Sequence, residues 1–497
     1  MTDIDKDLAS IQKARDLCTQ AREAMRSFQF ATQEEVDRIC EAMVEAAVAE
    51  AGRLGQLAHE ETGFGFPLHK KLKNEFAARN VWEYIKDTPT CGVLHHDKER
   101  KIVEIGAPVG VVVALTPSTN PTSTAIFKSL ISVKARNAVI VAPHPSASKS
   151  TAEAVRVITE AAEKAGMPHG LISCLENPTI QGTTELMSHY ATSMILATGG
   201  PGMVKAAHSQ GKPALGVGPG NVPAYVDRSA HVVKAAKMIV ESKSFDCSTI
   251  CATEQAVIAD RPIAERLKAE MQAQGAHWLT KEEADKLAAV MFRPNGMMVA
   301  GLVGRTPQYI AKKVGIQVPE TARILVADLE GIGADHPLSR EKLTTVLGFM
   351  VVDGWREGCD RAVEMLKFGG DGHSIVIHSR DEEAILTFGI EKPAFRILVN
   401  TWGSLGGVGY TTGLAPSLTL APGGVGGAAV GDNITLKHVL NVKRLAYHLR
   451  DAPEVAKLWG GREPGSAPVQ ATTSNEPGQD AINRIVAQVL AEMRGNN

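Results

Sequence analysis

The chain has 497 residues, 46 of them glycine, with 5% aromatic residues and a formal net charge of −2. This length exceeds what one hydrophobic core usually organises, so we expect two or three domains, and an apolar content dominated by Ala, Val, Ile and Leu favours a parallel α/β fold. The near-neutral charge and the absence of a long basic run argue against nucleic-acid binding.

The first residues, MTDIDKDLASIQKARDL, contain no apolar signal region, and no run of about 18 apolar residues follows, so we expect a cytosolic protein without a membrane segment. The seven cysteines form no CxxC pair and are expected to be reduced. Cys247 and Cys251 could lie one helical turn apart, but they lack a second pair or a histidine. We therefore predict no metal site.

The N-terminal part reads as helices over residues 3–27 and 32–61. Thr32 and Glu35 have the spacing of a capping box, and the second helix should end near Gly63. The pieces CGVLHH and KIVEI then flank the charged DKER, which predicts a β-hairpin that could form an extended arm.

From Pro108 strands and helices alternate. Strand patterns such as PVGVVVALTP, AVIVAPHP and SMILATGG are separated by helical ones, which predicts a right-handed, doubly wound, mostly parallel sheet. The loop ATGGPGMVKAA places glycines before a helix, where backbone amides could face a phosphate. The loop lacks the full GxGxxG spacing, so a simple tight turn is an equal interpretation.

The segment LGVGPGN carries Gly216, Gly218 and Gly220, which predicts unusual dihedrals or a close backbone approach. A second α/β unit should run from about Ser229 to Asn400. The glycine-rich passage after it should fold back over the first unit or its neighbour.

The stretch SKSFDCSTICATEQA sets Cys251 among small and hydroxylic residues, where a thiolate could meet a substrate. A nucleophilic cysteine must be partly reachable and in a setting that favours the thiolate. The alternative is a small buried apolar residue, the commoner fate of a lone cysteine.

The C-terminal region differs in composition. Residues 460–479 have the Pro, Gly, Ser and Thr content of a disordered linker. An apolar stripe on a short helix follows, formed by Ile482, Ile485, Val486, Val489, Leu490 and Met493. Such a helix is marginal alone in water, so it either docks back on its own domain or binds another protein.

Five segments in order, ALTPSTNPTSTAIFKSL, ATGGPGMVKAA, GVGPGN, SFDCSTICATEQAVI and NTWGSLGGVG with LAPSLTL, resemble the aldehyde dehydrogenase superfamily, and more narrowly its CoA-acylating branch. The resemblance covers about residues 5–450. It implies an aldehyde dehydrogenase-like α/β fold with a doubly wound NAD-binding domain, an α/β catalytic domain and a β oligomerisation arm. The implied boundaries are 1–228 for the NAD-binding domain with the arm at about 90–106, 229–400 for the catalytic domain, 401–459 for a return and oligomerisation region, 460–479 for the linker and 480–497 for a targeting helix.

The resemblance gives roles to matching residues. Cys251 would attack the aldehyde, and the Asn120 side chain with the Cys251 backbone N–H would stabilise the oxyanion. From the residues alone, a turn former before Pro121 is the preferred interpretation of Asn120. Hydride would pass to NAD, and CoA would accept the acyl group from the Cys251 thioester. Glu341 matches the family's ribose-binding glutamate. The residues expected beside the cofactor are Thr116, Pro117, His144, Gly199, Gly200, Gly202 and Glu341.

One departure favours the acylating branch. Hydrolytic relatives carry a glutamate in the segment matched by LGVGPGN, where it activates water, and this chain has no carboxylate there. Glu254 is a possible base that we expect to point elsewhere. His144 stands near where many hydrolytic members have a lysine, so NAD is favoured while NADP stays open.

The tail resembles the encapsulation peptides of bacterial microcompartment enzymes. It implies that residues 482–493 bind a shell protein and that the enzyme, a homo-oligomer without nucleic-acid or membrane partners, oxidises propionaldehyde from 1,2-propanediol inside such a compartment. Acetaldehyde is an alternative substrate. The rival functions are a dehydrogenase that releases the free acid, an idle scaffold, and a cysteine hydrolase, for which no histidine partner is identifiable.

Overall fold

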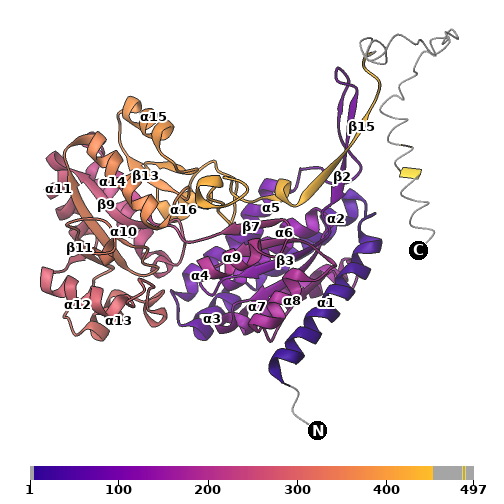
Figure 1. Ribbon diagram of the computed structural model, residues 1–497, viewed down its shortest axis with the longest axis horizontal. Helices are drawn as coiled ribbons and strands as arrows, with labels where there is room; N and C mark the ends of the chain where they lie inside the picture. The colour runs from indigo at the N-terminus through magenta and orange to yellow at the C-terminus, as the bar shows by residue number, and fades with distance from the viewer. Residues whose placement is uncertain (1–4, 451–483, 485–486, 489–497) are drawn as a thin grey trace, which may run out of the picture.

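The protein consists of two α/β bodies and a projecting β arm (Figure 1). The computed structural model describes residues 5–450, 484 and 487–488. Its sheets have five, seven and three strands, and the two larger sheets are parallel throughout. The α/β fold expected from the sequence is thereby confirmed. The predicted linker 460–479 and the apolar stripe within 482–493 lie outside the described residues.

Helices pack around the first body before its sheet begins. They are α1 (Lys6–Phe28), α2 (Gln33–Ala49), α3 (Ala51–Thr62), α4 (Pro67–Glu75) and α5 (Val81–Ile85). The Thr32 capping box with Glu35 is present, and Gly63 ends α3 in the left-handed conformation at φ 66°. The single helix expected over 32–61 is in fact two helices, because the chain leaves helical geometry at Glu50.

The five-stranded sheet has the order β5-β4-β3-β6-β7, which is the 3-2-1-4-5 order of a dinucleotide-binding fold. Its elements are β3 (Val111–Thr116), α6 (Pro121–Lys134), β4 (Ala138–Pro143), α7 (Ser148–Lys164), β5 (Ile172–Cys174), α8 (Ile180–Ser188), β6 (Thr192–Thr198), α9 (Pro201–His208) and β7 (Ala214–Val217). Helices α6 and α7 cover one face, and α1 and α8 cover the other. The strand order reverses between β3 and β6, so a crevice is expected at their carboxyl ends.

The seven-stranded sheet has the order β10-β11-β12-β9-β8-β13-β14. Its strands are β8 (Val222–Val226), β9 (Glu254–Asp260), β10 (Ala276–Trp278), β11 (Ile324–Asp328), β12 (Val346–Val352), β13 (Ile375–His378) and β14 (Ile397–Val399). The expected boundary at residue 228 is therefore wrong. Strand β8 is fully buried and pairs with both β9 and β13, so the second body begins at about Val222.

Helices cover both faces of this second sheet. They are α10 (Val232–Ser244), α11 (Arg261–Ala273), α12 (Lys281–Met291), α13 (Pro307–Val314), α14 (Gly354–Gly369) and α15 (Glu382–Glu391). Helices α10 and α11 share an apolar cluster on one face, while α14 and α15 share another on the opposite face. The sheet therefore forms the middle layer of this body.

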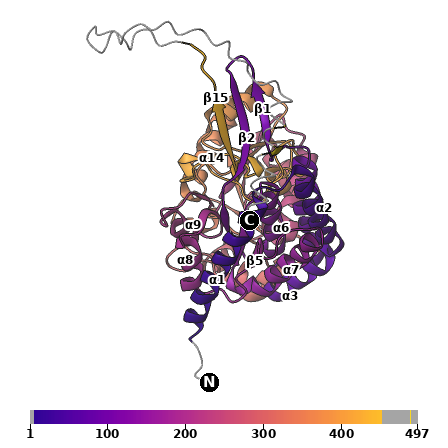
Figure 2. The same cartoon turned by 90° about the vertical axis from the view of Figure 1, so that its right-hand side faces the viewer.

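The arm is a three-stranded antiparallel sheet that rises from the first body (Figure 2). Strand β2 (Ile102–Pro108) pairs with β1 (Val93–Asp97) on one side and with β15 (Leu440–Ala446) on the other. The hairpin prediction is confirmed. Before β15 the chain forms α16 (Gly403–Gly407) and returns to the first body, where Leu405, Val408 and Leu420 join its apolar cluster. The expected fold-back is also confirmed.

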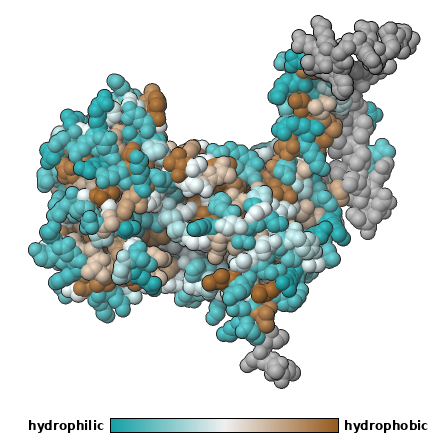
Figure 3. Space-filling model, in the orientation of Figure 1, coloured by the Kyte–Doolittle hydropathy of each residue, from teal (hydrophilic) through white to brown (hydrophobic). Residues whose placement is uncertain are grey.

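The surface is hydrophilic over much of the face in Figure 3, with apolar side chains in separate patches. Helix α15 carries exposed Leu386 and Ile390. In the part of the chain that the structure describes, no helix is long and apolar enough to cross a bilayer.

Candidate active site

A cavity of about 280 Å³ lies where the two bodies and the return segment meet. Its walls are residues 117–120, His144, 198–201, 217–219, 249–251, Val303, Glu341, Leu343, Val408, Leu418 and Leu420. The loops after β3 and β6 both contribute, as the topological switch between these strands requires. The cavity thus brings the dinucleotide-binding sheet to Cys251.

Most sequence-predicted residues line this cavity. They are Pro117, Asn120, His144, Gly199, Gly200, Cys251 and Glu341. Thr116 lies at the end of β3, one residue before the wall, and its buried hydroxyl has no hydrogen-bond partner in the protein. Gly202 lies in the first turn of α9 and is not part of the wall, so the structure does not bring it to the cavity.

Cys251 lies in a turn between the short 3-10 helix η3 (Phe245–Ser248) and β9. The residue as a whole is partly exposed. Burial raises the pKa of the thiol to about 12, the Glu341 carboxyl adds to this effect, and the Arg396 guanidinium opposes it. The resting residue is therefore a thiol, and its proton must leave before attack.

This pKa predicts slow alkylation of Cys251 by iodoacetamide. Because the thiolate is the reacting form and the pKa lies far above neutrality, the rate should rise about tenfold per pH unit between pH 7 and 9. The measurement is the pH dependence of labelling of the Cys251 peptide, followed by mass spectrometry. A plateau below pH 9 would contradict the prediction, and a rate limited by opening of the fold would appear as a pH-independent rate.

Asn120 precedes α6 but does not cap it with its side chain. Its Nδ2 donates to the Thr249 carbonyl oxygen at 2.9 Å, and its Oδ1 accepts from Lys73 Nζ at 2.6 Å. Nδ2 also lies 3.2 Å from Thr119 Oγ1. The side chain therefore bridges the two bodies beside Cys251, which is more than a turn former would do.

The Glu341 carboxylate lies against the segment LGVGPGN, which has no carboxylate of its own. Its Oε1 accepts from the backbone N–H of Gly220, in LGVGPGN, at 2.9 Å. Burial raises the pKa of this carboxyl to about 7, partly against the Gly220 N–H and the charges of Lys243 and Lys342. Sequence reasoning missed this placement because Glu341 is distant along the chain.

Glu254 is directed away from the cavity, as expected. It is fully buried, accepting from Ser242 Oγ at 2.5 Å and from the Gly403 N–H at 2.6 Å. Burial raises the pKa of its carboxyl to about 7. Its hydrogen bonds instead join α10 to α16.

Gly220 is needed because the chain approaches Cys251 closely there. A Cβ at this position would lie 2.5 Å from the Cys251 carbonyl oxygen and 3.0 Å from the His373 ring. The expectation of close approach in LGVGPGN is confirmed at this glycine. His373 is fully buried, its Nε2 has no hydrogen-bond partner in the protein, and burial holds its pKa well below the usual value. The loop of His373 thus reaches the site, while the histidine is neutral.

The glycine loop leaves room at the amino end of α9. No atom lies within 4 Å of a Cβ built on Gly200, so this glycine is not required by packing. His144 accepts from the Ser146 N–H through Nδ1 at 3.2 Å, and burial lowers its pKa. The neutral imidazole offers little attraction to a phosphate.

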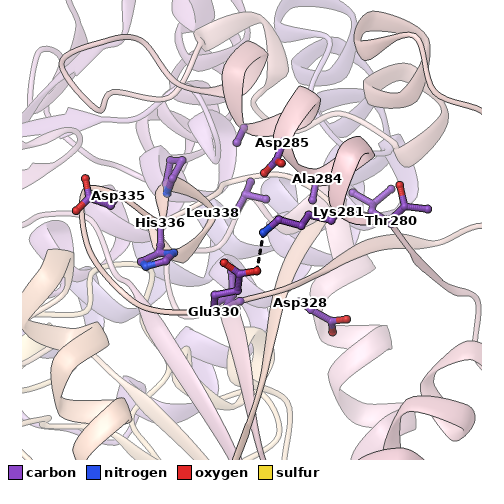
Figure 4. Close-up of a pocket in the computed structure, with 13 residues that line it drawn as sticks. Thr280, Lys281, Ala284, Asp285, Asp328, Glu330, Asp335, His336 and Leu338 are labelled. Atoms are coloured by element: carbon purple, nitrogen blue, oxygen red, sulfur yellow. Dashed lines mark hydrogen bonds and ion pairs between the residues drawn. The ribbon is translucent and has the colours of Figure 1, made fainter.

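A second hollow, of about 300 Å³, lies at the carboxyl ends of β10 and β11 (Figure 4). Several charged side chains surround it, and Lys281 is paired with Glu330. It contains none of the sequence-predicted residues. Among the described residues, no group of three His, Cys, Asp or Glu side chains could hold a metal ion.

Comparisons with known proteins agree with this geometry. Residues 6–291 match the model of the aldehyde dehydrogenase family, and the chain belongs to that family. The structure of an acetylating aldehyde dehydrogenase from Geobacillus thermoglucosidasius has 49% identity and a TM-score of 0.89, over 90% of this chain and 99% of that one.

Two more distant structures are of propionaldehyde dehydrogenases. A propionaldehyde dehydrogenase from the Clostridium phytofermentans fucose utilisation bacterial microcompartment has 28% identity and a TM-score of 0.79, over 87% and 97% of the chains. A Rhodopseudomonas palustris propionaldehyde dehydrogenase, solved with bound CoA and an acylated cysteine, has 25% identity and a TM-score of 0.79, over 87% and 97%.

Among curated relatives, aldehyde-alcohol dehydrogenase 2 of Entamoeba histolytica is 42% identical over 424 residues, which is 84% of this chain and 49% of the relative. The chain spans about half the length of the first curated relatives it matches.

Proposed function

We propose that the protein oxidises a short, uncharged aldehyde with NAD and CoA to an acyl-CoA. The observation that carries this proposal is the single cavity in which Cys251, Asn120 and the loops of the dinucleotide-binding sheet meet. The acetylating relative of known structure supports the same reaction class. The proposed residues are Cys251 as nucleophile, Asn120 as oxyanion donor, and Thr116, Pro117, His144, Gly199, Gly200 and Glu341 beside the cofactor.

The chemistry begins with loss of the Cys251 proton to solvent. The thiolate attacks the aldehyde carbon, and the oxyanion of the resulting thiohemiacetal accepts hydrogen bonds from the Asn120 amide and the Cys251 N–H. For this, Asn120 exchanges its 3.2 Å contact with Thr119 for the substrate oxygen. NAD, when bound, accepts the hydride. Cys251 is left as a thioester, which the CoA thiolate cleaves to release acyl-CoA and the Cys251 thiolate.

The carboxylates around the cavity indicate which molecule accepts the acyl group from Cys251. Glu341 is the only Asp or Glu in its wall, and its carboxyl is held by the Gly220 N–H. If Glu341 binds the ribose of NAD, no other carboxylate of the wall serves as a base for water. The CoA thiol ionises to a small extent near neutral pH by losing its proton to solvent, whereas water needs a base to attack, so CoA is the better acceptor. The Rhodopseudomonas palustris relative has both CoA and an acylated cysteine, which supports this choice.

The wall also bears on which cofactor and aldehyde fit. Among the described residues that form it there is no lysine or arginine, so a 2′-phosphate or a carboxylated aldehyde would find no cation there. This favours NAD over NADP and an uncharged substrate. The open space at Gly200 and the orphaned Thr116 hydroxyl are compatible with a bound dinucleotide.

A small apolar hollow of about 10 Å³ adjoins the cavity and shares Ile250, Val408 and Leu418 with it. Phe245 and Leu405 complete its apolar side. This space admits about one methyl-sized group, because roughly 10–15 Å³ is the room that one water needs. A short aldehyde fits best, so we propose propionaldehyde, with acetaldehyde as the alternative.

Three proposals concern assembly. The arm formed by β1, β2 and β15 would mediate homo-oligomerisation. The stripe within 482–493 would bind a shell protein, and the enzyme would work in the cytoplasm inside a bacterial microcompartment. The microcompartment relative supports the last two.

The test is NADH formation from propionaldehyde and NAD with and without CoA. We expect sustained turnover only with CoA, and propionyl-CoA equal to the NADH formed. Continued NADH formation without CoA, with propionate as product, would contradict the acylating assignment.

The same assay tests the aldehyde. Succinate semialdehyde, with its carboxylate, is expected to have a kcat/KM at least about 10²-fold below that of propionaldehyde, because a buried charge without a partner is costly. Comparable values for the two aldehydes would contradict an uncharged substrate class.

A further inference from the structure

A buried charged cluster lies directly behind the proposed oxyanion donor. Lys70 and Lys73 of α4 both pair with Asp246, at 3.1 and 2.5 Å, and all three side chains are at most 4% exposed. Buried charges of this kind are expensive unless every donor and acceptor is used. The groups that this cluster contacts are therefore the ones that it can hold in place.

Lys73 has three ammonium donors, and three acceptors meet them. They are Asn120 Oδ1 at 2.6 Å, Thr249 Oγ1 at 2.8 Å and Asp246 Oδ2. Burial lowers the pKa of Lys73 to about 8, against the opposing charge of Asp246, so the side chain is mostly an ammonium at neutral pH.

The contact with Lys73 fixes the orientation of the Asn120 amide. Lys73 can only donate, so Oδ1 must face it, and the Thr249 carbonyl can only accept, so Nδ2 must face that side. A cation on Oδ1 also polarises the amide and makes its N–H a stronger donor.

The same cluster holds the chain that leads to Cys251. Asp246, Cys247 and Ser248 have φ values of 45°, 51° and 64°, a left-handed run of three residues that are not glycine. Such backbone is unfavourable for residues with a Cβ and needs support from its surroundings. Asp246 supplies it by accepting from the Phe66 N–H at 2.8 Å and from Thr249 Oγ1 at 2.8 Å.

We propose that Lys73 is a positioning residue for the oxidation: anchored on Asp246, it fixes the Asn120 amide with Nδ2 toward the substrate oxygen. The inference rests on the proposed function, because it takes Asn120 as the oxyanion donor. The Lys73 ammonium is used by Asn120, Thr249 and Asp246 and donates no hydrogen bond to the aldehyde oxygen. Lys70 shares Asp246 but donates to the Thr119 carbonyl at 3.3 Å in place of Asn120.

Lys70 is therefore a matched control on the same helix. The experiment compares kcat, and KM for NAD and propionaldehyde, in Lys73→Met, Lys70→Met, Asn120→Ala and the double variants that pair each lysine change with Asn120→Ala. We expect Asn120→Ala to lower kcat about 10²-fold to 10³-fold, the usual cost of one oxyanion donor. Lys73→Met should lower kcat at least about 10-fold, with KM for NAD changed less than about twofold.

The double variants show whether each lysine acts through Asn120 or independently of it. Because Lys73 acts through Asn120, Lys73→Met/Asn120→Ala should have a kcat within about twofold of Asn120→Ala, whereas Lys70→Met should act independently of Asn120→Ala. Lys73→Gln retains an N–H donor and should have a kcat above that of Lys73→Met, a rescue that also serves if the Met variant does not fold.

Multiplicative losses in the Lys73→Met/Asn120→Ala variant, or a Lys73→Gln no better than Lys73→Met, would overturn the positioning role. Wild-type kcat in Asn120→Ala would instead overturn the proposed role of Asn120 in the reaction. The failures of the two proposals are thus distinguishable.

Discussion

Cys251→Ala is expected to lower kcat for NADH formation from propionaldehyde by at least about 10³-fold, because removing a covalent nucleophile leaves only binding and oxyanion stabilisation. Cys251 is the only cysteine in the wall of the cavity. The fold should tolerate the change, since the residue is partly exposed and alanine is smaller than cysteine. The measurement is steady-state NADH absorbance with saturating NAD and CoA.

Cys359→Ala is the matched control. Cys359 is likewise a free cysteine, but it is buried on α14 in the apolar cluster of the second body. We expect its kcat to stay within about threefold of the wild type, with a modest loss of stability. Equal losses in the two variants would mean that Cys251 acts through folding and is not the nucleophile.

Asp246→Asn is expected to destabilise the protein by about 3–5 kcal/mol, because it leaves the ammonium groups of Lys70 and Lys73 buried without a counter-charge. It also weakens the support for the left-handed run that ends at Ser248. The measurement is the free energy of unfolding in urea at pH 7, if the transition is reversible. A change below 1 kcal/mol would show that the cluster contributes little.

Asp353→Asn provides the comparison at the surface. Asp353 pairs with Arg261, but both side chains are more than 60% exposed. Such pairs contribute about 0–1 kcal/mol, so this variant should unfold at nearly the wild-type urea concentration.

The stability of the wild type and that of Asp246→Asn should also depend differently on pH. Burial alone would raise the pKa of Asp246, but the charges of Lys70 and Lys73 and hydrogen bonds from Lys73 and Phe66 outweigh it and hold the pKa at about 2. A carboxyl whose pKa is lowered in the folded state stabilises the fold above its ordinary pKa. That stability is lost as the pH falls from about 4 toward 2. Asp246→Asn should lack this part of the acid transition.

The strands and the place of Cys251 in the cavity wall could be predicted because these signals are local. The buried run of β3, the Thr32 capping box and the setting of Cys251 are each readable within a few residues. The domain boundary was misplaced because sheet membership of β8 depends on its partners β9 and β13. Pairing with strands far along the chain leaves no local signal.

The candidate site likewise depends on residues that are far apart along the chain. Asn120 could be predicted only through the family resemblance, and the segment that carries Lys70 and Lys73, PLHKKLKNE, has no local pattern that marks these lysines as buried. These two lysines are buried because Asp246, more than 170 residues away, lies opposite them. Glu341 likewise reaches Gly220 across 121 residues. Long-range charge pairing of this kind requires the structure.

The most direct test of the central claim is mass spectrometry of Cys251 after mixing the enzyme with propionaldehyde and NAD, before and after addition of CoA. Without CoA, we predict about one NADH per active cysteine and a propionyl group on the Cys251 peptide. Addition of CoA should remove that group and yield propionyl-CoA. An unmodified Cys251 during continued NADH formation, or an acyl group on another residue, would contradict acyl transfer from this cysteine to CoA.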